Sequence, residues 1–319
     1  KSFDDKIWRE PVVQKMGGTP LTALLLLFYF HIHGRFDVRY ATYDLIVQFT
    51  LLEVWEKMKS GIFQKRYIRL NDFFLEVQRP DFLNNHPEIA LQISALANLC
   101  FDCLFDTQSK NVLRDIPKNG ILQNFTLFLQ NRKGIICTKS DARKKADEWF
   151  TAFHKEGLFI AAGFEAYRFV HSTVMEFLAA KYLLSPALQG EPFQKALKQI
   201  TDSTDKSVES LPIACGESCQ TGYQLLRDIK TIMGDKPDIS LAFRCLAEVE
   251  TAEQERLHGI EEMKRPWEAA QREMKEGDDA KRWVYKQLAD RVMNKGPQTV
   301  RELCNSFFAG IPLCQPTFQ

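Results

Sequence analysis

The chain has 319 residues, of which 45% are hydrophobic and 26% are charged. These fractions are typical of a folded soluble protein and exclude a disordered chain. The 42 Lys and Arg residues nearly balance the 41 Asp and Glu residues, so the overall charge does not favour a nucleic-acid or anionic-membrane partner. A chain of this length can form two or three units, each with its own core.

The longest apolar run, residues 21–32, lies between Gly18 and Gly34. It is well short of the roughly 20 residues that a membrane-spanning helix needs. We therefore interpret it as a buried helix and expect no membrane partner. The chain starts at Lys1 without an initiating Met or a targeting segment, and we expect it to be part of a longer protein.

The eight cysteines lie mostly within apolar helical stretches. This distribution is typical of reduced thiols that serve as small core residues in a cytoplasmic protein. Cys100 and Cys103 form one close pair, and Cys215 and Cys219 form another. A zinc site needs two such pairs in loops, or one pair followed by spaced histidines, so we expect no metal in this chain.

The first predicted helix starts at Thr19 and Pro20 and ends at Gly34. Threonine is a good N-cap, and proline suits the first helical position, where its missing N–H has no helical partner. A second helix is predicted over 40–59 because apolar residues recur there at helical spacing. They are Leu45, Phe49, Leu52 and Trp55.

Less regular segments flank the third predicted helix, 89–104. Residues 64–86 are predicted to form a connector with one short helix at about 70–77. The stretch from 105 to Cys137 is predicted to be loose, because helix-limiting residues interrupt it. They are Pro117, Gly120 and Gly134.

A capping pattern predicts the next helix, which starts after Thr138 and ends at Gly157. Two strands are predicted over 158–162 and 166–170, joined by a turn at 163–165. A helix is then predicted from Thr173, with Glu176 completing a second capping box. A helix, a tight hairpin and a helix are typical of the end of a winged-helix domain.

Beyond Pro186 the pattern predicts one helix after another. The predicted helices cover about 193–200, 206–211, 222–233 and 240–249, with Pro212 among the breaks. Such a series is typical of an α-solenoid, in which each helical pair buries its apolar face by stacking on a neighbour. The more charged remainder is predicted to contain a few amphipathic helices, one with an apolar face of Val284, Leu288 and Val292.

One segment after the hairpin carries a resemblance to a known family. Its residues are Phe169, His171, Thr173, Glu176, Phe177, Leu178, Ala179 and Ala180. The segment resembles the F-x-H-x-S/T-x-x-E-F-L-A-A signature that closes the winged-helix domain of NACHT-family STAND ATPases. Val174 departs from the signature, because an aromatic residue usually follows the Ser/Thr position.

Other segments resemble the same family in the same order. The helix that starts at Pro20 resembles the first helix of the lid domain, Arg39 and Tyr43 match an R-x-x-x-Y segment, and Trp55 matches a late tryptophan. Residues 241–248 resemble the A-x-x-C-L-A-E helix of bacterial members with helical repeats.

The resemblance implies a mainly α fold in five parts. These are a helical lid segment (1–62), a connector (63–85), a winged-helix domain with a small β-hairpin (86–186), a HEAT-like, α-solenoid-like region (187–250) and a charged helical C-terminal region (251–319). In the family, the lid proline packs on the adenine and the winged-helix histidine reaches the β-phosphate of ADP. By resemblance these nucleotide-binding roles fall on Pro20 and His171.

The sequence contains no G-x-x-x-x-G-K-S/T motif and no strand ending in paired acids. We therefore expect this chain alone to be no enzyme, and expect it to bind ADP or ATP only together with a P-loop domain that it lacks. The resemblance further implies a cytoplasmic signalling ATPase that oligomerises on activation, with a helical region that senses an unknown ligand or protein. Defence against pathogens or phage is a common use of the family.

Other interpretations of these features remain open. His171 could be a purely structural histidine between strand and helix, and Pro20 simply a helix-starting proline. The basic run Arg143–Lys145 is predicted to be a solvated helix face, although a winged-helix DNA-binding regulator would place recognition residues there. We do not expect a nucleic-acid partner, since Glu165 rather than a basic residue occupies the hairpin turn. A helical protein-interaction scaffold is the third possibility.

Overall fold

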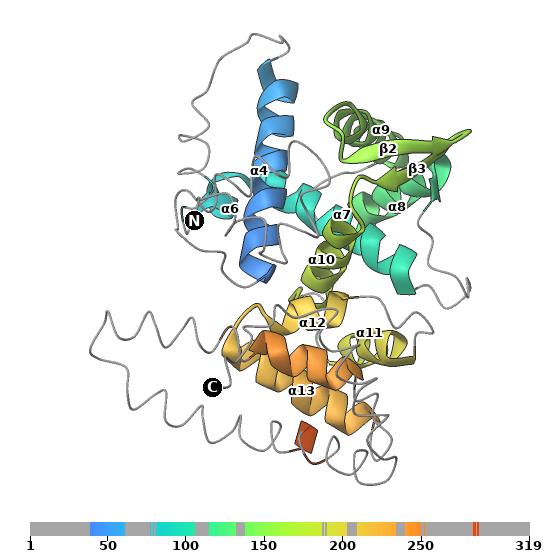
Figure 1. Cartoon of the computed structure of the whole chain (residues 1–319). Coiled ribbons are helices and arrows are strands. Elements are labelled where there is room, and N and C mark those ends of the chain that lie inside the picture. Colours follow the sequence, from blue (N-terminus) through green and yellow to red (C-terminus); the bar gives the residue numbers. More distant parts are fainter. Residues whose placement is uncertain are drawn as a thin grey trace, which may run out of the picture. The chain divides into compact units, whose positions relative to one another are not determined.

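The computed structural model describes a mainly helical protein with one small antiparallel sheet (Figure 1), as the sequence predicts. The described residues are 39–60, 77, 79, 81–105, 115–131, 138–186, 188, 190–202, 209–233, 240–249, 252, 283–284 and 286. They belong to two compact units. The sheet unit comprises Tyr43–Gln199 and Ser203–Ser210, and the described part of the helical unit consists mainly of residues 211–233 and 240–249.

The elements follow one another in this order: α4 (Arg39–Ser60), α6 (Phe82–Asn85), α7 (Pro87–Phe105), β1 (Ile116–Pro117), α8 (Lys118–Asn131), α9 (Lys139–Lys155), β2 (Phe159–Gly163), β3 (Ala166–Phe169), α10 (Ser172–Leu183), α11 (Glu191–Asp202), α12 (Ser210–Cys215) and α13 (Cys219–Met233). Residues 240–249 form a further helix. The helices predicted over 40–59, 89–104, 193–200 and 240–249 are confirmed within a few residues at each end.

Helix α4 is buried over a wider arc than its sequence pattern indicates. Tyr43, Ile46 and Val47 are buried together with the predicted Phe49 and Leu52. The predicted stripe is wrong at Leu45, which is only half-buried, because the buried arc is centred on Tyr43, Ile46 and Val47 and leaves Leu45 at its edge. The side chain of Trp55 and the helix predicted from Pro20 lie outside the described residues, as does the short helix at about 70–77 except for Val77.

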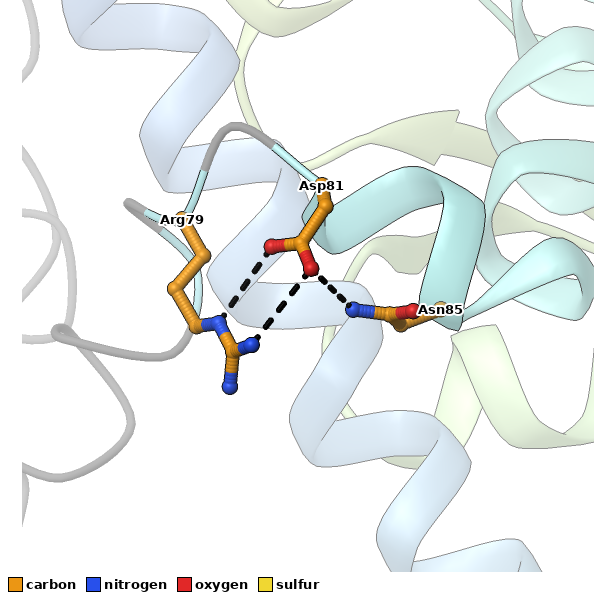
Figure 2. Close-up of polar contacts among 3 residues, drawn as sticks. All are labelled: Arg79, Asp81 and Asn85. Carbon is orange, nitrogen blue, oxygen red and sulfur yellow. Dashed lines mark hydrogen bonds and ion pairs between the residues drawn. The ribbon is translucent and has the colours of Figure 1, made fainter.

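A local polar cluster joins the residues before the short helix α6 to its last residue (Figure 2). The carboxylate of Asp81 accepts hydrogen bonds from the Arg79 guanidinium, at 3.3 and 3.4 Å, and from Asn85 Nδ2 at 2.8 Å. The amide of Asn85, followed by the guanidinium, lowers the pKa of Asp81 below its usual value. The ion pair between Arg79 and Asp81 is exposed, so it orders the start of α6 locally and adds little stability.

Helix α7 is the central helix of the sheet unit, because both α8 and α10 pack against it. Its buried residues include Ile89, Ile93, Leu96 and Cys100, which recur at helical spacing. Glu88 in its first turn accepts a hydrogen bond from Trp149 Nε1 at 3.0 Å and pairs with Lys145 at 3.0 Å. The start of α7 is thereby fixed to α9.

The prediction of a loose segment after α7 is wrong, because it contains β1 and the 14-residue helix α8. Pro117 lies just before the helix, where the missing N–H of proline breaks no helical bond. Gly120 lies in the first turn, and its cost in a helix of about 1 kcal/mol is small beside the burial of several large side chains. These are Ile121, Leu122, Phe125 and Leu129.

Helix α9 starts as the capping pattern predicts. Asp141 N donates to Thr138 Oγ1 at 3.1 Å, and Thr138 Oγ1 donates to Asp141 Oδ2 at 2.6 Å. The helix ends before Gly157, whose φ of 77° lies in the left-handed region that favours glycine. Trp149 and Phe153 from its buried face meet Phe125 of α8 edge to face, and these rings form the core beside the sheet.

The sheet has the strand order β1-β3-β2, with both pairs antiparallel. The predicted hairpin is confirmed, except that Gly163 pairs with Ala166 and only residues 164 and 165 form the turn. Glu165 has a φ of 52°, and its carbonyl accepts a hydrogen bond from Lys118 N at 2.8 Å. The hairpin turn is therefore anchored to the start of α8.

In the helical unit, the prediction of a break at Pro212 is wrong. Pro212 lies in the first turn of α12, where proline is tolerated. Helix α13 begins three residues before the predicted start, because Ser218 Oγ accepts a hydrogen bond from Thr221 N at 3.2 Å and caps the helix. Val284 is buried as predicted, whereas Leu288 and Val292 lie outside the described residues.

Helix α7 is the one helix among the described residues that is long and apolar enough to cross a membrane. Its most apolar window is 72% buried against the rest of the protein, as expected for a core helix. The five described cysteines are buried free thiols, as predicted, and burial raises the pKa of Cys100 and Cys215 well above the usual value.

Candidate functional site

The predicted nucleotide-contacting histidine lies at the junction of β3 and α10. Val170 N donates to Leu158 O at 3.0 Å, which extends the hairpin pairing by one residue beyond Phe169. His171 follows in an extended conformation, with φ −132° and ψ 131°, and is the N-cap residue of α10. Its carbonyl accepts a hydrogen bond from Met175 N at 3.4 Å. The strand therefore leads directly into the helix at His171.

The predicted capping box of Thr173 and Glu176 is wrong. Because the hairpin pairing holds the chain extended through Val170, the turn into the helix occurs immediately afterwards, and Ser172 is the first helical residue. Thr173 is therefore inside the helix, and its buried Oγ1 has no hydrogen-bond partner among the described residues. The N-cap residue makes no side-chain capping bond either.

These features make the start of α10 suitable for an anion. The first N–H groups of a helix have no helical acceptor, and the helix dipole adds partial positive charge there. Burial lowers the pKa of His171 below its usual value, so the imidazole is mainly neutral at neutral pH. A neutral imidazole still carries one N–H donor. The site can thus donate hydrogen bonds to a phosphate oxygen.

The position of α10 is fixed by the elements around it. Val174, Met175, Phe177 and Leu178 are buried, and the helix packs along α7. On its other side, Lys181 Nζ forms a 2.6 Å ion pair with Asp44 Oδ1 of α4. Tyr43 of α4 also contacts Phe177, with ring centroids 5.9 Å apart. Helix α10, which follows His171, is therefore tied to α4.

The Lys181–Asp44 pair was not predicted from the sequence, because 137 positions separate the two residues. A weak signal existed in each helix. Lys181 interrupts the apolar run 177–184, and Asp44 lies next to Tyr43 and close to the buried Val47. A charged side chain at such a place needs a partner of opposite charge, but the sequence does not identify that partner.

The other predicted residues lie apart from this site or outside the description. Pro20 lies outside the described residues. In the basic run of α9, Lys145 pairs with Glu88 and Arg143 donates to Asn119 at 3.4 Å. Lys144 is exposed, as predicted for a solvated helix face.

No group of three His, Cys, Asp or Glu side chains is placed to hold a metal ion in the part of the chain that the structure describes. Comparisons with protein-family models, with curated proteins and with solved structures find no match to this chain.

Proposed function

We propose that this chain is the regulatory part of a NACHT-type STAND ATPase, comprising lid, winged-helix and solenoid-like segments. With a P-loop domain that its sequence lacks, it would clamp ADP and keep the protein in a closed, inactive state. Exchange of ADP for ATP would release the winged helix and expose surfaces for oligomerisation. The observation that carries this proposal is the position of His171 as the N-cap residue where β3 leads into α10.

The order of the elements supports the winged-helix interpretation. A winged helix has three helices, a short strand between the first two and a hairpin after the third, with the last strand in the middle of the sheet. The corresponding elements here are α7, β1, α8, α9, β2 and β3, in the sheet order β1-β3-β2. Helix α10 then follows the hairpin, as in the family signature.

Charge and hydrogen bonding at the start of α10 favour a diphosphate as the ligand. A phosphate carries several strong acceptor oxygens, whereas the N-terminal N–H groups of α10 and the His171 imidazole supply donors. Because a ligand can shift a two-state equilibrium only through contacts that differ between the states, the His171 contact would have to exist in the ADP-bound state alone.

The ion pair between Lys181 and Asp44 supports mechanical coupling of the two regulatory segments. In the proposed assignment, α4 belongs to the lid and α10 to the winged helix, so one short contact joins both sides of the nucleotide clamp. A movement of α10 would therefore displace α4.

In the helical unit, the close approach of α13 to α12 and to helix 240–249 at Gly222 is consistent with stacked, solenoid-like helices.

The test uses the protein together with the P-loop domain that the proposal requires. His171→Ala is expected to lower the ADP content of the purified protein and to raise the fraction of oligomer, measured by nucleotide extraction and by light scattering. His154→Ala is the matched control, because His154 bonds the Phe159 carbonyl at 3.0 Å within the same unit and has no proposed role with nucleotide.

If His171→Ala retains the wild-type ADP content and remains monomeric, the proposed role of this residue is wrong. Salt-dependent DNA binding by the chain, lost when Lys144 is replaced by Ala, would favour the winged-helix DNA-binding regulator instead.

A further inference from the structure

We draw no further inference here: the strongest candidate, the cavity of about 550 Å³ between the carboxy-terminal ends of α7 and α10 and helix α11, carries none because its lining presents Asp102 and Lys195 with opposite charges and its phenylalanine rings are almost completely covered, so that neither charge nor apolar contact selects one class of ligand.

Discussion

Gly222 provides a sharp test of the packing in the helical unit. A Cβ added at this position would lie 2.5 Å from Val249 Cγ2 and closer still to the Cys215 carbonyl oxygen. Non-bonded carbon atoms pack at about 3.5–4.0 Å, so the neighbours would have to move by about 1 Å. The carbonyl belongs to the backbone and cannot rotate away as a side chain can.

Two effects oppose each other in Gly222→Ala. Alanine is preferred over glycine inside a helix by about 1 kcal/mol, whereas overpacking of this kind costs up to about 3 kcal/mol. We therefore expect Gly222→Ala to lower the free energy of unfolding by about 2 kcal/mol. The clash decides the sign because it involves α12 and helix 240–249 at once.

The control is Gly120→Ala in α8, where the nearest atoms to an added Cβ are 3.9 and 4.0 Å away. This substitution is expected to stabilise the sheet unit by about 0.5–1 kcal/mol. Urea titrations followed by far-UV circular dichroism measure both variants. If Gly222→Ala proves as stable as the wild type, the close approach of these three helices is not present in solution.

Three further predictions concern single contacts. Lys181→Met and Asp44→Asn should each lower the free energy of unfolding by about 1–3 kcal/mol. A double-mutant cycle measured in urea should show that the two side chains stabilise each other. Thr138→Ala should cost about 1 kcal/mol through loss of the α9 cap, and a Thr138→Asn variant measured alongside should recover most of it. The pKa of His171 is lowered in the folded state. The contribution of neutral His171 to stability should therefore be complete above its unfolded pKa of 6.5 and should decline as the pH falls from 6.5 to the folded pKa. The stability difference between wild type and His171→Gln, measured from pH 8 to about 5, should change over that window only.

Features fixed by local chemistry were predictable from the sequence. The cap at Thr138, the stop at Gly157 and the hairpin that follows depend on residues within a few positions of one another. Their physical causes are a side-chain acceptor for a free N–H and a glycine at positive φ. For that reason the segment from α9 to β3 was predicted nearly correctly.

Features decided by tertiary contacts were not predictable in the same way. Pro117 and Gly120 read as helix-limiting residues, yet the burial of the apolar face of α8 outweighs their local cost. The N-cap of α10 is His171 rather than Thr173, because pairing of the strands fixes the chain up to Val170. The partner of Lys181 comes from α4 and leaves no pattern in the sequence.

The contact between His171 and a phosphate is the central claim, and NMR of histidine-labelled protein tests it most directly. The protein must include the P-loop domain that the proposed function requires, and the pKa of His171 is measured with and without ADP. An adjacent phosphate stabilises the imidazolium ion, so ADP should raise the pKa of His171. A pKa of His171 that does not respond to bound ADP would contradict the proposed function.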